Sequence, residues 1–330
     1  MNVLSRIKDK AKGKKRRVVL PEGTEPRMIQ AAKKILSEGI ASVTLLGDQQ
    51  EIEKLAKEHG LNLGKVEVID PSHSGDYNDY VSEFMTIRQA KGITEEQART
   101  TISSPLYFGA MLVRHDKADA SVAGSINTTG DVLRAAIQVL GLKEGIRTVS
   151  SCFLMTIPKY RDVLNKVFLF ADGGVVPNPS AEQLASITVS TAQTMKNLLE
   201  EEPKIAMLSF STKGSAKHKD VDKVLEALKI LKKDHPELKV DGEFQVDAAI
   251  VPEVAKQKAP DSEIAGEANV LIFPDLDAGN IAYKLTERLA NATATGPIIQ
   301  GLAKPANDLS RGCSVDDIVD VTAIAVLMKG

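Results

Sequence analysis

The sequence predicts an α/β protein with largely parallel sheets, divided into two domains. Short runs rich in β-branched residues alternate with longer stretches of helical periodicity, which is the pattern of repeated strand–helix units. The chain has 330 residues, and a single hydrophobic core rarely serves more than about 250–300 residues. Two α/β domains are therefore expected.

The first half opens with strands alternating with helices. The apolar run Arg17–Leu20 reads as a strand that ends at the turn Pro21–Gly23, and the helix over Arg27–Ser37 has its apolar residues on one side. A strand at Val43–Leu46 continues the alternation. Further elements are expected as helices over Ile52–Glu58, Asp79–Ala90, Thr94–Thr101, Pro105–Val113 and Val132–Leu140, and as strands at Val66–Ile69 and Ala120–Ala123.

The second half restarts the alternation. Its strands are expected at Val149–Met155, Val167–Phe170, Ile205–Ser209 and Val270–Phe273, with an apolar run at Ile298–Leu302, and its helices over Ala181–Leu199, Asp220–Lys233, Ile281–Leu289 and Val315–Met328.

No flexible linker rich in proline or serine divides the chain, so the two domains are expected to be joined by ordered crossings. The candidates are Gly141–Gly145 and Gly301–Pro305. Two crossings would return the last helix to the first domain. The expected domains are then residues 1–143 with 303–330, and residues 144–302, with a cleft between them lined by both.

Composition and charge exclude several classes of protein. The net charge of −2, from 42 basic and 44 acidic residues, does not fit broad binding to nucleic acid. No apolar stretch approaches the ~20 residues of a membrane helix, and the charged segment Met1–Arg17 is not a secretory signal. Only two cysteines, Cys152 and Cys313, argue against a disulfide framework and favour a reducing cytoplasm. No metal is assigned, because the histidines are scattered and Asp277 is explained as a helix cap.

A first candidate anion site is the turn between the expected strand at Ala120–Ala123 and the following helix. Ser125, Thr128 and Thr129 bring small hydroxyls and free backbone N–H groups to a helix start, and Arg134 lies about one turn further on. Such a turn suits a phosphate. Ordinary N-capping by Thr128 or Thr129, with a solvated Arg134, explains the same residues equally well.

A second candidate is the hydroxyl-rich segment Ser209–His218, where Lys213 and Lys217 could contact a phosphate. It lacks the spacing of a P-loop, and the chain has no well-placed G-x-G-x-x-G. A flexible surface loop is the favoured interpretation, although the end of a strand is where ligands enter such folds.

A third candidate is Asn307–Asp317, just before the last helix. Ser314 is a plausible N-cap with an aspartate in the first turn. Capping does not explain Arg311, which beside Ser310 would make an anion clamp, with a nearby carboxylate such as Asp317 as general base.

Three other features carry simpler interpretations. Arg88 is expected to be a solvated helix residue, and the basic run Lys8–Arg17 a solvated helical face. Cys152 reads as a buried apolar cysteine, whereas Cys313 lies in a more exposed loop.

Taken together, these segments resemble the phosphate acetyltransferase (phosphotransacetylase) family in its short form. The resemblance spans essentially the whole chain in the family's order. The matching segments are Val18–Gly23, Ala206–Lys217, Asp241–Ala249, Gly279–Lys284, Gly296–Leu302 and Asn307–Cys313.

The resemblance implies two three-layer α/β domains with an interdomain cleft, like the isocitrate and isopropylmalate dehydrogenases, and a homodimer. It implies that Arg311 binds the phosphoryl or acetyl group, that Ser310 contacts the reacting centre and that Asp317 takes the proton of the coenzyme A thiol. One departure is Asn127-Thr128-Thr129, where many members have His-Ser-Thr. Substrate contacts are implied for Arg88, Ser125, Thr128, Thr129, Arg134, Lys213, Tyr283 and Gln300.

The implied reaction is reversible acetyl transfer between acetyl-CoA and phosphate, with coenzyme A as substrate and no permanently bound cofactor. A thiol needs modest help to ionise, so direct attack by the thiolate suffices and no acyl-enzyme on Cys152 or Cys313 is expected. The alternatives are a butyryl-transferring enzyme, a metal-dependent dehydrogenase, which would need clustered aspartates, and a non-catalytic sensor of coenzyme A or acetyl phosphate.

Overall fold

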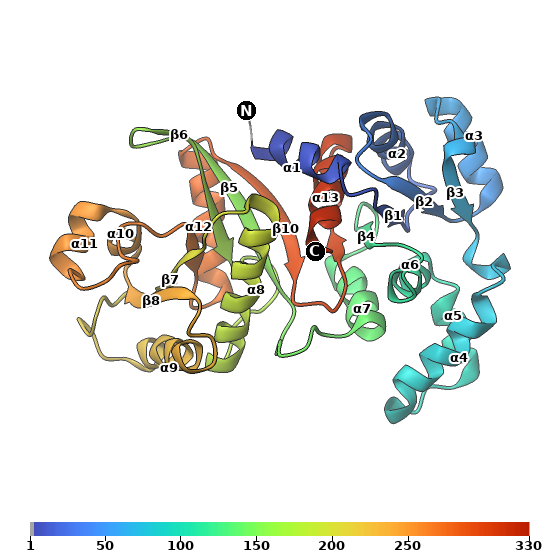
Figure 1. The fold of residues 1–330 in the computed structure, drawn as a ribbon. Coiled ribbons are helices and arrows are strands. Elements are labelled where there is room, and N and C mark those ends of the chain that lie inside the picture. The colour runs from blue at the N-terminus through green and yellow to red at the C-terminus, as the bar shows by residue number, and fades with distance from the viewer. Residues whose placement is uncertain (1–2, 330) are drawn as a thin grey trace. The chain divides into compact units, whose positions relative to one another are not determined.

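The computed structural model describes residues 3–329, which divide into two compact units. Unit 1 comprises Val3–Lys143 and the segment from Leu302 onward, and unit 2 comprises Glu144–Gly301. The chain leaves unit 1 after Lys143 and re-enters it at Leu302, where a bridge pairs Leu142 with Leu302. Each unit has its own sheet flanked by helices (Figure 1).

Unit 1 has a five-stranded, entirely parallel sheet in the order β11-β4-β1-β2-β3. Its interior strand β4, between β11 and β1, is buried along its whole length. The strands are β1 (Arg17–Leu20), β2 (Ser42–Leu46), β3 (Val66–Ile69), β4 (Ala120–Ala123) and β11 (Ala306–Asp308). The helices are α1 (Val3–Lys12), α2 (Pro26–Glu38), α3 (Gln49–His59), α4 (Tyr77–Arg88), α5 (Glu95–Ile102), α6 (Pro105–Arg114), α7 (Thr129–Leu140) and α13 (Val315–Met328).

The last helix, α13, belongs to the core of unit 1. Nine of its residues are buried, and it packs against α1, α2 and β4. The basic side chains of Lys8–Arg17 are exposed or partly exposed, as expected, but the helix α1 ends at Lys12, and its opposite side buries Val3, Ile7 and Ala11. The strand β11 was not expected, since three residues beside a proline carry too little pattern to reveal a strand.

Unit 2 has a six-stranded sheet in the order β10-β5-β6-β9-β7-β8, part antiparallel and part parallel. Its strands are β5 (Ser150–Tyr160), β6 (Val163–Ala171), β7 (Lys204–Leu208), β8 (Lys239–Phe244), β9 (Val270–Ile272) and β10 (Thr293–Gln300). Its helices are α8 (Ala181–Leu199), α9 (Lys219–Asp234), α10 (Val246–Ile250), α11 (Pro252–Lys258) and α12 (Leu276–Leu289).

The expectation of a largely parallel sheet is wrong for one side of unit 2. The strands β5 and β6 form an antiparallel hairpin, and β10 pairs antiparallel with β5. Only Arg161 and Asp162 connect β5 to β6, and a parallel crossover needs a dozen residues or more. The edge strand β8 was missed because its polar sequence lacks a strand pattern.

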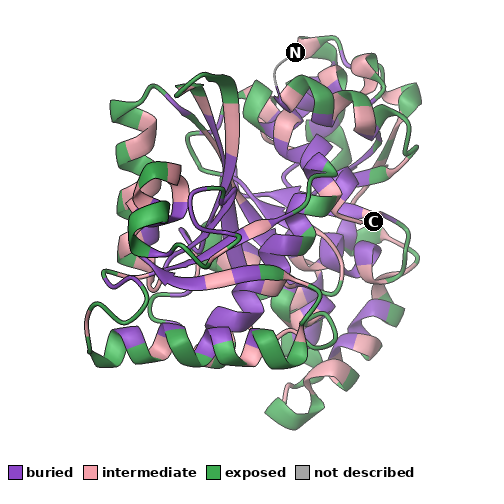
Figure 2. Cartoon of the chain, turned by 60° about the vertical axis from the view of Figure 1, so that its left-hand side comes forward, coloured by how far each residue is buried: buried purple, intermediate pink, exposed green. Residues whose placement is uncertain are grey.

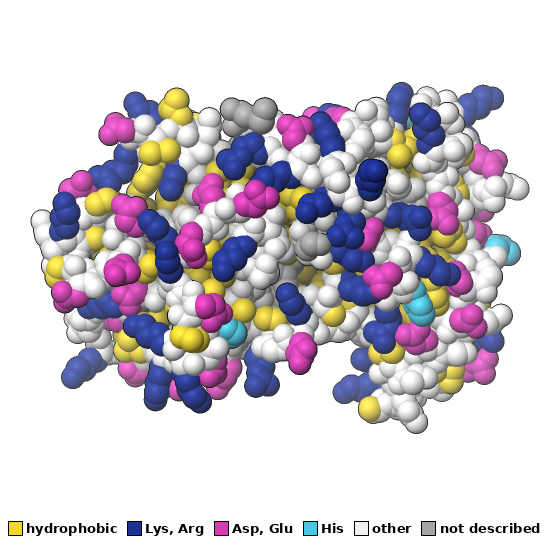
Figure 3. Space-filling view, viewed as in Figure 1, with side chains coloured by type: hydrophobic (Ala, Val, Ile, Leu, Met, Phe, Trp, Pro, Cys, Tyr) yellow, Lys and Arg dark blue, Asp and Glu magenta, His cyan; other side chains and the backbone are white. Residues whose placement is uncertain are grey.

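Burial follows the same layers in both units. The strands and the helix faces against them are buried, whereas the outer helix faces are exposed (Figure 2). On the face shown in Figure 3, basic and acidic side chains are intermingled. Within residues 3–329, no helix is both long and apolar enough to span a bilayer.

Candidate active site

Three neighbouring strands of unit 1 bring the first and third candidate segments together. Because β11, β4 and β1 are adjacent and parallel, their carboxyl ends meet at one edge of the sheet. The loop from Gly124 to Thr128 follows β4, the loop from Leu309 to Ser314 follows β11, and Pro21–Glu25 follows β1. This edge is where open α/β sheets bind ligands.

The carboxylate of Glu22 holds the loop after β4. Its Oε2 accepts hydrogen bonds from Gly124 N (2.9 Å), Ser125 N (2.8 Å) and Ser125 Oγ (2.6 Å). Its Oε1 accepts from Ile126 N (3.2 Å), Asn127 N (2.9 Å) and Asn127 Nδ2 (2.8 Å). Glu22 is only 4% exposed, so the loop is wrapped around a buried charge.

These contacts change the interpretation of the loop as a phosphate cradle. The backbone N–H groups of residues 124–127, expected to be free, all donate to Glu22, and so does the hydroxyl of Ser125. Burial raises the pKa of Glu22, but the hydrogen bonds from Ser125 and Asn127 outweigh burial and bring the pKa below its ordinary value. Glu22 therefore stays ionised at neutral pH, and its carboxylate occupies the anion-binding position that the N–H groups of this loop form.

The start of α7 is built by capping, as the simpler interpretation of this segment held. Thr128 is the N-cap: its Oγ1 accepts from Asp131 N at 3.2 Å and donates to Asp131 Oδ2 at 2.7 Å. Arg134 is exposed and pairs with Asp131 Oδ1 at 2.7 Å. Thr129 instead donates its hydroxyl to Asp308 Oδ2, at 2.6 Å, on the neighbouring strand β11.

Two predicted substrate arginines act electrostatically on Tyr107. Burial raises the pKa of Tyr107, and the positive charges of Arg134 and Arg88 oppose this rise. Tyr107 donates to Gln138 Oε1 at 3.3 Å. Arg88 ends α4 and is partly buried rather than fully solvated.

The loop after β11 presents Ser310 and Arg311, both exposed. Arg27 of α2 fixes its backbone: Nη1 donates to Arg311 O and Cys313 O, both at 2.9 Å, and Nη2 donates to Ser125 O at 2.9 Å. Arg27 thus ties this loop to the loop after β4. The side chain of Arg311 is left available, since no described residue hydrogen-bonds its guanidinium.

Asp317 closes the capping box of α13. Its Oδ2 accepts from Ser314 N at 2.8 Å and from Ser314 Oγ at 2.9 Å, and the side chain is exposed. The expectation that Cys313 is exposed is wrong, because its thiol is buried beside Arg27 and Asp317. Burial raises the pKa of Cys313.

Three candidate residues lie in unit 2. Lys213 is exposed, and its Nζ donates to Asp241 Oδ1 (2.7 Å) and Gly242 O (2.8 Å). Tyr283 of α12 stacks on Phe153 with ring centroids 3.9 Å apart. Gln300 is only 3% exposed. Its Oε1 accepts from Thr194, and its Nε2 donates to Ser150 and Thr191, so it offers no group to a ligand in this structure.

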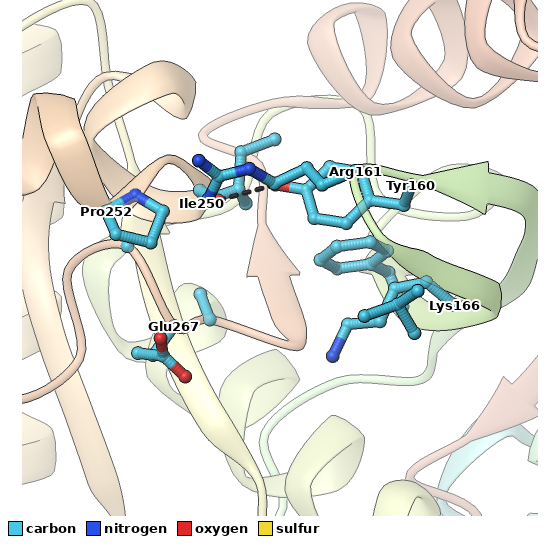
Figure 4. Close-up of a pocket in the computed structure, with 10 residues that line it drawn as sticks. Tyr160, Arg161, Lys166, Ile250, Pro252 and Glu267 are labelled. Atoms are coloured by element: carbon cyan, nitrogen blue, oxygen red, sulfur yellow. Dashed lines mark hydrogen bonds between the residues drawn. The ribbon is translucent and has the colours of Figure 1, made fainter.

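Unit 2 also contains a pocket of about 180 Å³ beside the β5–β6 hairpin (Figure 4). Tyr160, Arg161 and Lys166 of the hairpin line it opposite Ile250 and Glu267, and the hydroxyl of Tyr160 donates to Ile250 O at 2.5 Å. None of the candidate residues from the sequence lines this pocket.

Sequence reasoning missed three residues of unit 1: Glu22, Arg27 and Asp308. Each acts through partners about 100 or more positions away, apart from Arg27's bonds to Glu25. The available signal was chemical, since all three are charged residues, and Glu22 and Asp308 lie at or just after the ends of strands. The cap of α12 is Asp275, not Asp277, since Asp275 accepts from Ala278 N at 2.9 Å. Within residues 3–329 no cluster of three or more potential metal ligands occurs.

Residues 2–326 match the family described as phosphate acetyl/butaryl transferase. The chain belongs to this family. It is 53% identical over 323 residues to the phosphate acetyltransferase of Thermoanaerobacterium thermosaccharolyticum, covering 98% of each chain. It is 43% identical over 323 residues to that of Bacillus subtilis, again covering 98% of each.

Solved structures agree with this assignment. A phosphotransacetylase from Streptococcus pyogenes is 42% identical, with a TM-score of 0.94 and coverage of 99% of this chain and 98% of that one. A 4-hydroxythreonine-4-phosphate dehydrogenase from Klebsiella pneumoniae is 10% identical, with a TM-score of 0.55 over 96% of this chain and all of that one. The second likeness concerns the fold alone, which is dehydrogenase-like, as expected.

Proposed function

We propose that the chain catalyses reversible acetyl transfer between acetyl-CoA and phosphate, giving acetyl phosphate and coenzyme A. Membership of the phosphate acetyl/butaryl transferase family, with near-full-length relatives named phosphate acetyltransferase, carries the proposal. The edge of the sheet at β11, β4 and β1 supports it, because Arg311 and the start of α7 lie on adjacent loops there.

In the proposed step, Asp317 removes the proton from the coenzyme A thiol. The thiolate attacks the acetyl carbonyl of acetyl phosphate, a C–S bond forms, the C–O bond to phosphate breaks, and phosphate leaves with the electron pair. Arg311 neutralises the departing phosphate, and Ser310 contacts the reacting centre. Holding both substrates in place lowers the entropic barrier by several kcal/mol.

No acyl-enzyme is needed in this scheme. Cys152 is fully buried in β5, and burial raises its pKa strongly, with the charge of Asp172 adding to the rise. The more nucleophilic thiolate form is therefore disfavoured. Cys313 is shielded and less acidic for the same main reason. Coenzyme A is substrate, and no resident cofactor is required.

Among the remaining candidates, we propose substrate contacts for Arg88, Arg134, Lys213 and Tyr283. The hydroxyls of Ser125, Thr128 and Thr129 would reach a substrate only by sharing or changing their present partners. Gln300 we assign to the internal packing of unit 2, because its whole amide group is hydrogen-bonded there.

We also propose a homodimer, in the cytoplasm, with one domain at residues 1–143 and 303–330 and the other at residues 144–302. The helix α12 supports the dimer, because Ile281, Leu285 and Leu289 are 56%, 51% and 79% exposed at four-residue spacing. An apolar stripe of this kind is typical of a surface covered by another chain.

The direct test mixes purified protein with acetyl phosphate and coenzyme A and follows thioester formation. We expect the unmodified protein to turn over both substrates and Arg311→Ala to lower this turnover strongly. The control Arg6→Ala, at an exposed position of α1, should leave turnover unchanged. No turnover would refute the proposal. Binding of coenzyme A or acetyl phosphate without turnover, unaffected by Asp317→Asn, would identify a non-catalytic sensor. A preference for butyryl phosphate over acetyl phosphate would identify a butyryl-transferring enzyme.

A further inference from the structure

A second buried carboxylate, Asp308, flanks the loop that Glu22 holds from the other side. Asp308 ends β11 and is only 2% exposed. Its Oδ2 accepts from the hydroxyl of Thr129, the first residue of α7, at 2.6 Å. Its Oδ1 is fully buried, and no residue that the structure describes donates a hydrogen bond to it.

The two carboxylates differ sharply in how their charge is compensated. Glu22 receives six hydrogen bonds, four of them from backbone N–H groups. Asp308 has fewer hydrogen-bond donors around it. Its Oδ1 lies so close to Gly124 that a β-carbon added to this glycine would be only 2.5 Å from the oxygen. Burial, with some repulsion from Glu22, raises the pKa of Asp308 to about 6, although the Thr129 hydroxyl and the backbone N–H of Leu309 oppose the rise.

The bond to Thr129 connects Asp308 to the helix start at which an anion would bind. Thr129 and Gly130 occupy the first turn of α7, where backbone N–H groups point away from the helix and attract negative charge. An anion on the N–H of Thr129 would lie within roughly 8 Å of Asp308, about three hydrogen-bond lengths. At that distance, in partly buried surroundings, two negative charges repel one another appreciably.

Resting on the proposed function, we infer that Asp308 is a positioning residue that couples anion binding at the start of α7 to uptake of one proton. A bound anion makes the ionised form of Asp308 less favourable, so the carboxyl takes up a proton. By linkage, protonation of Asp308 must then tighten anion binding by the same factor. The neutral carboxyl can still pair with the Thr129 hydroxyl, so the helix start keeps its place.

Other charges near Asp308 do not supply this coupling. The elements that pack on β11 are β4, α7 and α13, and β4 carries no charged residue. On α7, Asp131 is already paired with Arg134. Beyond these, Arg311 on the same loop is permanently positive, and the titratable groups closest in the chain are Glu22, which stays ionised, and the aspartates of the first turn of α13.

The test measures binding of sulfate, a tetrahedral dianion that does not titrate near neutral pH, to the full chain by isothermal titration calorimetry. We expect the sulfate affinity of the unmodified protein to fall about sixfold between pH 5.5 and 7.5, most of the roughly tenfold total that a one-unit rise in the pKa of Asp308 produces. Titrations in buffers of different ionisation enthalpy are expected to show proton uptake on binding. Asp308→Asn, which keeps the shape and an acceptor for Thr129, should abolish both effects.

Thr129→Val provides an independent variant. It removes a hydrogen bond that favours ionised Asp308, so the inflection of the sulfate affinity should move to higher pH, whereas Thr129→Ser should leave it in place. Unaltered proton uptake in Asp308→Asn, an unmoved inflection in Thr129→Val, or no sulfate binding at any pH would overturn the inference. Thioester formation is measured separately. If it is normal while these results fail, the inference about Asp308 is wrong and the proposed function stands; if it is absent, the proposed function is wrong.

Discussion

The carboxylate of Glu22 offers the sharpest test of how the site is held, through the substitution Glu22→Gln. Glutamine keeps the size of the side chain but replaces one acceptor oxygen with an NH₂ group. That group would face three donors, either those of Gly124 and Ser125 or those of Ile126 and Asn127. Donors that face donors lose their hydrogen bonds whichever way the amide is oriented.

The expected loss of stability follows from this count. Each buried donor left without an acceptor costs about 1–3 kcal/mol, with the lower value for the partly exposed Asn127. We expect Glu22→Gln to lower the free energy of unfolding of unit 1 by about 3–5 kcal/mol at pH 7, a large part of a typical total of about 5–15 kcal/mol. Urea unfolding followed by far-UV circular dichroism measures the change.

The control is Glu53→Gln, on the exposed face of α3, for which we expect a change within about 0.5 kcal/mol. The pH dependence gives a second check. Because the pKa of Glu22 is lowered on folding, its ionised form stabilises the protein above the ordinary carboxyl value of 4.5, and this contribution is lost as the pH falls through the folded-state pKa. The difference between the two proteins should therefore shrink in acid. A loss below about 1 kcal/mol at pH 7 would refute the reasoning.

Three further predictions address other parts of the structure. Arg27→Met removes the donors that join the loops after β4 and β11, so we expect KM for acetyl phosphate to rise about tenfold with the fold intact by circular dichroism; an unchanged KM would contradict this. Gln300→Leu leaves buried hydroxyls without partners and should cost about 2–3 kcal/mol in urea unfolding while kcat stays near the original value, whereas a selective loss of kcat would indicate a substrate contact. Cys152 should resist iodoacetamide at pH 7.5 and react only after unfolding, as mass spectrometry of the alkylated peptide can show; rapid labelling of the folded protein would contradict its burial.

Local chemistry was predictable from the sequence where all the partners lie within a few residues. Ser314 caps α13 as expected, and the capping box of Thr94 with Gln97 likewise joins residues only three positions apart. The alternation of strands and helices in unit 1 was predictable for the same reason, since β1, β2 and β3 each carry their own apolar pattern. The parallel order of these strands then follows from the intervening helices.

Contacts between distant segments were not predictable in this way. The turn that follows β1 contains Glu22, but nothing nearby indicates that its partners are the N–H groups of residues 124–127. The short strand β11 becomes recognisable only when β4 supplies its hydrogen bonds. Residue types at strand ends suggested where an anion would bind, whereas the tertiary fold decides which donors remain available.

A buried carboxylate that accepts hydrogen bonds from the N–H groups of a loop, as Glu22 does, also occurs at other strand ends, which indicates a physical cause. Asp172, directly after β6, accepts hydrogen bonds from Ser151 and from the backbone N–H groups of residues 174–176. Glu243, near the end of β8, accepts from Ser211 Oγ and Gly214 N, both at 2.8 Å. All three carboxylates, including Glu22, are less than 5% exposed. A loop leaving a sheet turns several N–H groups inward without a helix or strand to pair them, and each needs an acceptor.

One carboxylate satisfies several such donors at once, because its two oxygens offer about four acceptor positions. Burying the charge is costly by itself, but converging N–H dipoles offset that cost, and the resulting loop has little conformational freedom left to lose when a substrate binds. Asp308 differs because no comparable set of donors surrounds it. Glu22, whose many donors lower its pKa, is therefore suited to hold its loop at any physiological pH, whereas Asp308, with few donors, is suited to change its protonation state when an anion arrives.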